Sequence, residues 1–79
     1  MQLRILFFGV YREMSGARER DLSLPVGSRV SDVVAALRLR PGLELPAQPV
    51  VAVNQEYARM DLQLEEGDEV ALIPPVAGG

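Results

Sequence analysis

The sequence ends in two glycines, Gly78 and Gly79, and this ending is its most distinctive chemical feature. At an average glycine usage of about 7%, glycine fills both last places by chance in about half a per cent of proteins. A terminal carboxylate is a poor electrophile until it becomes an acyl adenylate, which requires that it enter the ATP site of another enzyme. Because glycine has no side chain, such a terminus fits a narrow channel that a larger residue would block. We therefore expect Gly79 to be activated by a second protein.

The residue types that are missing restrict the chemistry that the chain performs alone. It contains no His, Cys, Lys, Thr or Trp, and its eight cationic side chains are all Arg. His is the usual general base and Cys the usual soft nucleophile, and both are common metal ligands. A self-contained hydrolase, a thiol enzyme and a zinc site are therefore disfavoured. Arg holds its charge and does not act as a proton-shuttling amine.

Charge is distributed unevenly along the chain. Residues 1–43 hold seven Arg and four acidic residues, a net charge of +3, whereas residues 44–79 hold one Arg and seven acidic residues, a net charge of −6. An acidic half repels phosphate backbones, so we expect no nucleic-acid partner. The same charge either steers the C-terminus toward a basic protein surface or only keeps the chain soluble.

The length predicts a single domain. Neither half of a divided 79-residue chain would bury a core of its own. Without Cys there is no disulfide to support a small core, which is consistent with a reducing cytosol. No secretory leader is apparent, and the apolar runs are far shorter than the ~20 residues that cross a bilayer. We expect a soluble cytoplasmic domain with no membrane partner.

The first strand is expected over residues 3–8, which are rich in strand-forming side chains and alternate between two faces. The natural core face carries Leu3, Ile5 and Phe7. The other face begins polar and becomes apolar at Leu6 and Phe8. Residues 10–16 form a connection with at most a short helical turn. Residues 18–24 alternate again and predict a second strand, which pairs with the first as a hairpin.

Residues 28–40 change to the period of a helix. Apolar side chains recur at i, i+3, i+4 and i+7, namely Val30, Val33, Val34 and Leu37. Ser28 or Ser31 is expected to cap the start, and Asp32 suits the first turn. Pro41-Gly42 ends the pattern. This is the only long helix that the sequence predicts.

Two further strands are expected in the second half. Residues 50–53 form a wholly apolar run, typical of a buried strand, and residues 69–73 form the last strand after a tight turn at 65–68. Residues 57–64 are irregular, with at most a short strand or helical turn. The order predicts an α+β domain in which one helix packs on one face of a mixed sheet of four to five strands.

An apolar patch is expected on the sheet face that the helix leaves open. Alternation in the last strand sends Val70 and Leu72 to the core. The open face then receives four apolar side chains: Leu6, Phe8, Ala71 and Ile73. Such a patch usually marks a partner site. The alternative is that the irregular segment 58–64 covers it.

The chain divides into a domain over residues 1–75 and a flexible C-terminal tail over residues 76–79. Pro74-Pro75 is expected to stiffen the exit and to direct the tail away from the sheet. Extended at about 3.3–3.6 Å per residue, the tail reaches roughly 13 Å from the domain.

Five segments carry a resemblance to a known family. They are Leu6-Phe7-Phe8, Arg12-Glu13 with Gly16, Val53-Asn54-Gln55, Gly67-Asp68-Glu69-Val70, and Ile73-Pro74-Pro75-Val76-Ala77-Gly78-Gly79. Together they resemble the MoaD branch of the MoaD/ThiS sulfur carriers, and MoaD is the small subunit of molybdopterin synthase. The resemblance covers essentially the whole chain. It implies a β-grasp, or ubiquitin-like, topology in which the first and last strands are parallel central neighbours.

The resemblance implies a mechanism. An adenylating enzyme activates Gly79 with ATP, and a sulfur donor converts the adenylate to a thiocarboxylate. The sulfur is then donated to cyclic pyranopterin monophosphate inside the large subunit of molybdopterin synthase, in a heterotetramer with two carriers at opposite ends of a large-subunit dimer. Catalytic residues are expected on that subunit, and no cofactor or metal on this chain. The residues expected to enter the large subunit are Pro75, Val76, Ala77 and Gly78.

The resemblance also adds Tyr57 to the apolar patch, because the family places an apolar contact after the Asn54-Gln55 turn. Ala71-Leu72-Ile73 departs from a family run that is often aromatic, so we expect a less bulky interface there. Arg12-Glu13 is more simply a solvated pair than a functional one. Glu65-Glu66-Gly67-Asp68 is more simply a turn than a calcium loop.

Other functions stay open at this point. A carrier for thiamine, cysteine or tRNA thiolation would share the fold and the thiocarboxylate. A ubiquitin-like modifier would form isopeptide bonds instead. A plain interaction domain would use neither chemistry.

Overall fold

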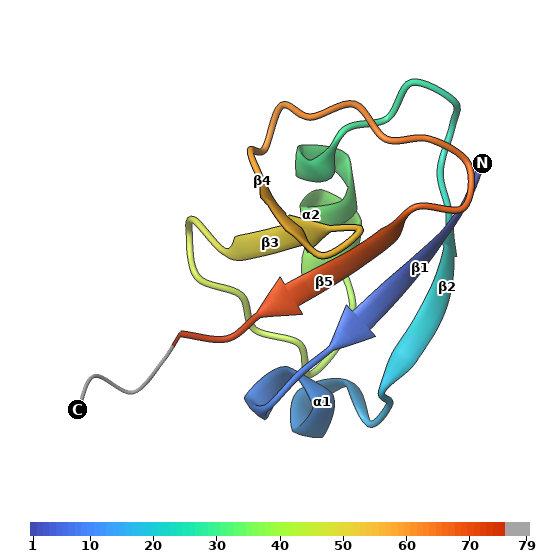
Figure 1. Cartoon of the computed structure of the whole chain (residues 1–79). Coiled ribbons are helices and arrows are strands. Elements are labelled where there is room, and N and C mark those ends of the chain that lie inside the picture. The colour runs from blue at the N-terminus through green and yellow to red at the C-terminus, as the bar shows by residue number, and fades with distance from the viewer. Residues whose placement is uncertain (76–79) are drawn as a thin grey trace.

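The computed structural model describes residues 1–75 as a five-stranded sheet with two helices (Figure 1). The sequence predictions for Val76, Ala77, Gly78 and Gly79 therefore lie outside the described residues. The elements in chain order are β1 (Gln2–Phe7), α1 (Val10–Ser15), β2 (Glu19–Ser23), α2 (Val30–Arg38), β3 (Val50–Val53), β4 (Glu56–Ala58) and β5 (Glu69–Ile73).

The sheet is mixed, and its strand order is β2-β1-β5-β3-β4. The first and last strands, β1 and β5, are parallel neighbours near the centre, as predicted. The other pairs are antiparallel: β1 with β2, β3 with β5, and β3 with β4. The helix α2 lies behind the sheet in Figure 1, so the opposite face stays open. This is the expected β-grasp arrangement.

The core lies between the sheet and α2 and contains the side chains that the periodicity predicts. Leu3, Ile5 and Phe7 are buried, and so are Val70 and Leu72 of β5. The helical stripe is buried too, at Val30, Val33, Val34 and Leu37. Sequence reasoning missed three core residues: Tyr11 of α1, which is 2% exposed, and Leu43 and Leu64 outside the helices and strands, which are 6% and 3% exposed. A six-residue helix is too short for its period to show which side is buried.

The start of α2 differs from the prediction. The helix begins at Val30 after Arg29, whose backbone N–H donates to Asp32 Oδ2 at 2.7 Å. Ser28 does not cap the helix, because its hydroxyl donates to the Pro25 carbonyl at 2.7 Å and closes the preceding turn. The prediction that Ser28 or Ser31 is the cap was wrong, whereas Asp32 does stabilise the first turn.

The irregular segment after β4 does not cover the open face. The backbone N–H of Val30 donates to the Leu62 carbonyl at 3.0 Å, and that of Ser31 donates to the Met60 carbonyl at 2.9 Å. Leu64 N–H donates to the Ser28 carbonyl at 2.9 Å. These bonds hold residues 59–64 against the start of α2, so the open face stays accessible. Neither helix within residues 1–75 is long and apolar enough to cross a membrane.

Candidate functional site

The open face carries a groove because one row of side chains across the sheet is small in the middle and large at its ends. In the strand register, Leu6 lies opposite Ala71, Ala71 opposite Ala52, and Ala52 opposite Tyr57. The two alanines form a low floor between the leucine on β1 and the tyrosine on β4. The resulting groove has a volume of about 310 Å³. It is lined by Leu6, Phe8, Ala52, Gln55, Tyr57, Glu69, Ala71 and Ile73.

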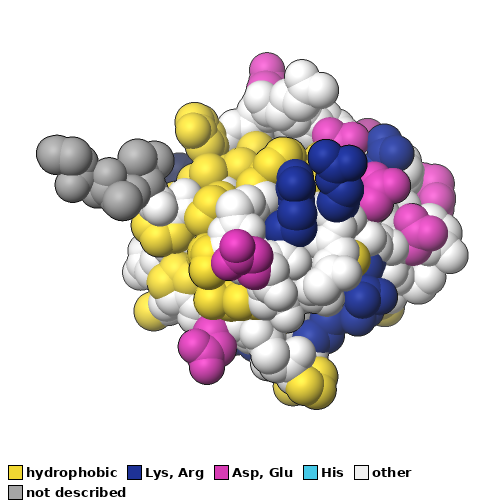
Figure 2. Space-filling view, turned by 90° about the horizontal axis from the view of Figure 1, so that it is seen from below, with side chains coloured by type: hydrophobic (Ala, Val, Ile, Leu, Met, Phe, Trp, Pro, Cys, Tyr) yellow, Lys and Arg dark blue, Asp and Glu magenta, His cyan; other side chains and the backbone are white. Residues whose placement is uncertain are grey.

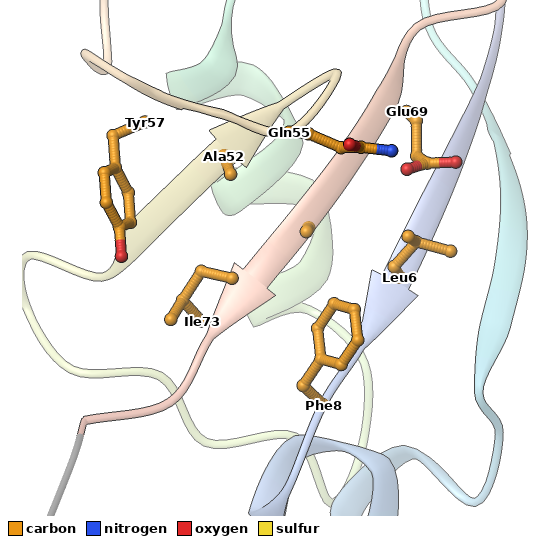
Figure 3. A pocket seen from close by; sticks show the side chains of 8 residues that line it. Leu6, Phe8, Ala52, Gln55, Tyr57, Glu69 and Ile73 are labelled. Carbon is orange, nitrogen blue, oxygen red and sulfur yellow. The ribbon is translucent and has the colours of Figure 1, made fainter.

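The structure brings together all five side chains that were predicted to form a partner interface, namely Leu6, Phe8, Tyr57, Ala71 and Ile73. Two of them are exposed despite their size, Phe8 at 40% and Tyr57 at 80%. Figure 3 shows Phe8 and Ile73 at one end of the groove and Tyr57 on its β4 side. Figure 2, which views the molecule from below, shows hydrophobic side chains gathered on the left, whereas most visible Arg side chains lie to the right. An exposed apolar area of this kind is typical of a protein-docking surface.

The other end of the groove is polar and was not predicted. Glu69 begins β5 and pairs with Arg4 of β1, with 3.0 Å between Arg4 Nη2 and Glu69 Oε2. A second acidic side chain, Glu19, lies 3.9 Å from Arg4. The Gln55 side chain extends over β5 toward Glu69 (Figure 3). Sequence reasoning missed Ala52, Gln55 and Glu69, because their place beside the groove depends on how distant strands align.

The turn that carries Gln55 has an unusual backbone. Asn54 and Gln55 connect β3 to β4 in two residues, and both have positive φ, 50° and 72°. The Asn54 side chain holds the turn against β5, since its Nδ2 donates to Asp68 Oδ1 at 2.9 Å and its Oδ1 accepts from Glu69 N–H at 3.0 Å. Asn tolerates a left-handed backbone, but for Gln it costs about 1 kcal/mol. The side chain of Asn54 thus joins the segment 53–55 to the segment 67–70, two segments that carry the family resemblance.

Comparison with known proteins identifies the family. The model of the ThiS family matches residues 5–79, which include every residue of the groove. The chain belongs to the ThiS family. Two curated relatives are each called molybdopterin synthase sulfur carrier subunit. The one from Chlamydomonas reinhardtii is 40% identical, over 100% of both chains. The one from Homo sapiens is 35% identical, over 99% of this chain and 94% of the relative.

Solved structures with the same fold include two that the chain matches over its whole length. SAMP1 from Haloferax volcanii superposes with a TM-score of 0.82 at 28% identity, covering 100% of both chains. A chain from the complex of subunits 1 and 2 of the molybdopterin-converting factor of Helicobacter pylori superposes with a TM-score of 0.75 at 23% identity, also covering 100% of both. The family model and the curated relatives confirm the resemblance to the MoaD branch of the family.

In this ThiS-family chain the groove opens toward the point where the chain leaves the sheet. Ile73 lines the groove and is followed by Pro74, which lies against the junction of β1 and α1. A Cβ on Gly9 would come within 3.1 Å of Pro74 Cγ, and Gly9 has a φ of +52°. A glycine at this position therefore allows Pro74 to approach closely. Pro75 is exposed.

The remaining polar candidates stay outside the groove. Arg12 and Glu13 are exposed on α1 and form no ion pair with each other in the described part of the chain. Residues 65–68 form a turn, in which Glu65 N–H donates to Asp68 Oδ2 at 2.8 Å and Asp68 N–H donates to the Glu65 carbonyl at 3.1 Å. Across residues 1–75, no three His, Cys, Asp or Glu side chains gather closely enough to hold a metal ion.

Proposed function

We propose that this chain is the sulfur carrier subunit of a molybdopterin synthase. The observation that carries the proposal is its full-length similarity, at 35–40% identity, to relatives that bear that name. The apolar groove beside the chain exit supports it, since a carrier needs a surface on which its partner seats. The absence of His, Cys and Lys also supports it, because a carrier leaves acid–base chemistry to its partners.

Activation takes place at the carboxylate of Gly79. In the proposed reaction an adenylating enzyme transfers AMP from ATP to this carboxylate and releases pyrophosphate. A sulfur donor then displaces AMP, and the product is a thiocarboxylate. Two terminal glycines suit this step because the backbone passes a narrow channel without side chains. ATP is a substrate of the activating enzyme, and this chain itself binds no cofactor.

Transfer follows when the carrier docks on the large subunit. Leu6, Phe8, Tyr57, Ala71 and Ile73 form the contact surface in this proposal. Pro75 is exposed at the exit, and Val76, Ala77 and Gly78 follow it into the large subunit. There the thiocarboxylate sulfur forms a C–S bond to cyclic pyranopterin monophosphate, and an oxygen substituent leaves that carbon. Water then cleaves the acyl–sulfur bond, which leaves the sulfur on the pterin and restores the Gly79 carboxylate. The large subunit supplies the acids, bases and phosphate-binding groups, and two carriers occupy opposite ends of its dimer in the cytoplasm.

Mass spectrometry with C-terminal mapping tests the activation step. Replacing one oxygen with sulfur adds about 16 mass units, which equals the gain on oxidation of a methionine, and the chain contains three Met. Cleavage after Glu69 releases Val70 to Gly79, a peptide without Met, and removes the ambiguity. We expect the gain on this peptide after incubation with the activating enzyme, ATP and a sulfur source.

A thiol-directed alkylating reagent gives an independent reading. Because the chain has no Cys, the reagent labels only a thiocarboxylate. A variant that lacks Gly79 serves as the control and should take up no label. If the complete chain also stays unlabelled, the proposed function is wrong. Adducts joined to lysines of other proteins would instead favour a ubiquitin-like modifier.

A further inference from the structure

Apolar docking leaves two residues of the groove unexplained, Gln55 and Glu69. The other six lining residues are apolar or aromatic. Burial of a polar group against an apolar partner is unfavourable unless it finds a hydrogen-bonding partner. These two side chains lie at the same end of the groove, and the Gln55 side chain points toward Glu69 (Figure 3). The polar end therefore requires a partner group of its own.

The backbone at Gln55 indicates that its side chain is used. The second position of a two-residue hairpin turn with positive φ favours glycine, because glycine has no Cβ to clash. The chain instead holds a glutamine there at a φ of 72°. Within residues 1–75 the Gln55 amide takes part in no hydrogen bond, so the fold gains no such bond from it. Because no hydrogen bond of the described residues offsets this backbone strain, we infer that the Gln55 side chain serves to bind another molecule.

Glu69 offers an acceptor beside this amide. Among residues 1–75 it is the only charged side chain that lines the groove, and it is 24% exposed. Its Oε2 accepts from Arg4 at 3.0 Å, whereas Oε1 accepts no hydrogen bond from the described residues. The Gln55 carbonyl oxygen is a second acceptor. Two acceptors, one of them charged, match a cationic side chain with several N–H donors.

We propose that Gln55 and Glu69 form a recognition site for one Arg or Lys side chain of the protein that seats in the groove. The inference rests on the proposed function, in which that protein is the large synthase subunit. Glu69 begins β5 and Ile73 ends it, so the cation binds about 13 Å from the chain exit. A charged contact at one end and the chain exit at the other allow only one orientation of the partner along β5.

A second copy of this chain is a poorer occupant than a different protein. The cation nearest the groove, Arg4, already pairs with Glu69 and lies near Glu19. A second copy would have to break this pair in order to offer Arg4. A two-fold contact through the groove would also bring the two Glu69 carboxylates close, and like charges repel. The cationic side chain that binds Gln55 and Glu69 therefore belongs to a different protein.

Isothermal titration of the large subunit into the full chain tests the proposal. Glu69→Gln keeps the shape and removes the charge, and we expect it to weaken binding about tenfold or more. Arg4→Met removes the internal ion pair but leaves the carboxylate, so affinity should stay equal or rise. If Glu69 served only to hold Arg4, the two variants would weaken binding alike, and that result overturns the proposal.

Gln55→Gly supplies a second test, because a purely structural role of Gln55 does not predict higher stability together with weaker binding. Removing the strained side chain should raise the melting temperature by about 4–8 °C, as relief of a left-handed backbone predicts for a domain of this size. The same change should weaken binding to the large subunit severalfold. Gln48→Gly, in an exposed loop away from the groove, is the control and should leave affinity unchanged. Unchanged affinity for Gln55→Gly contradicts the inference.

Two measurements separate this inference from the proposed function. Each variant is loaded with the activating enzyme, ATP and a sulfur source, and alkylation of the thiocarboxylate is scored. Suppose that the wild-type chain is labelled normally and that the groove variants Glu69→Gln and Gln55→Gly bind the large subunit as tightly as the wild type does. This result overturns the recognition site and leaves the proposed function standing. No labelling of the wild type overturns the proposed function and the inference with it. If the isolated chain forms a dimer, and both groove variants are monomeric, the groove binds a second copy of this chain. That result overturns the choice of a different protein as the partner.

Discussion

Ala52 of β3 and Ala71 of β5 lie directly opposite each other in the sheet, and each is 8% exposed. Each side chain is a single methyl group, so the sheet surface is low along this pair. Leu6 stands on one side of the pair and Tyr57 on the other. The depth of the groove therefore depends on two residues that are 19 positions apart in the chain.

Filling this floor should block docking without harming the fold. In Ala71→Leu the longer side chain points into the open groove, where it occupies the space of a partner side chain. We expect affinity for the large subunit to fall about tenfold or more, with stability changed by less than ~0.5 kcal/mol. Ala35→Leu, on the exposed side of α2, is a matched control that should bind normally. Calorimetric titration of both variants decides the matter, and normal binding by Ala71→Leu contradicts the assignment.

Tyr57 should contribute strongly to binding and little to folding. This residue of β4 is 80% exposed, and binding of a partner would cover it. We expect Tyr57→Ala to cost about 2 kcal/mol in binding, as central aromatic contacts do. Leu39→Ala removes a side chain that is 85% exposed but lies just after α2, away from the groove. Surface plasmon resonance should show a faster dissociation for the first variant only, and equal rates would contradict a docking role.

Asn54 should matter for stability through its side-chain bonds to β5. It donates to Asp68 and accepts from the Glu69 backbone, and it adopts a φ of 50°. Asn54→Ala loses both bonds and also the short polar side chain that lets Asn tolerate a left-handed backbone, so we expect a loss of about 2–3 kcal/mol. Asn54→Gly loses the bonds alone and should be destabilised less. Urea denaturation measures both, and the reverse order would show that backbone strain is unimportant here.

Arg38 should stabilise the loop before β3. Its guanidinium donates to the carbonyls of Leu45, Pro46 and Ala47 at 2.7–3.2 Å. These bonds are exposed to water, so we expect Arg38→Met to cost only about 1 kcal/mol in global stability. Amide hydrogen exchange in residues 43–49 should nevertheless rise, because the loop loses its attachment to α2. Arg40→Met is the control, since within residues 1–75 the Arg40 side chain forms no hydrogen bond.

Local patterns in the sequence were enough to predict β1, β2, β3, β5, the main helix and the core faces, whereas β4 was left open as a short strand or a helical turn. Alternation assigned Leu3, Ile5 and Phe7 to the core, and the period of residues 30–37 assigned the buried side of α2. Both periods depend only on the geometry of a single element, so they can be read without knowing its neighbours. For the same reason, alternation in β1 and β5 placed Leu6, Phe8, Ala71 and Ile73 on one open face.

The family resemblance predicted two features that alternation along a strand does not, namely the position of Tyr57 and the order of the strands. It placed Tyr57 beside the patch, and the structure puts that residue opposite Ala52. It also predicted the topology in which the first and last strands run parallel, because the motifs it matched span both.

Contacts between residues far apart in the chain were decided by the tertiary structure alone. The polar end of the groove exists because Gln55 and Glu69 both line it, after the β3–β5 register brings Val53 opposite Val70. The start of α2 was set by the use of Ser28 in the preceding turn and by backbone bonds to residues 60–64. Such alignments depend on hydrogen bonds and packing between separate elements, and no repeat along one element encodes them.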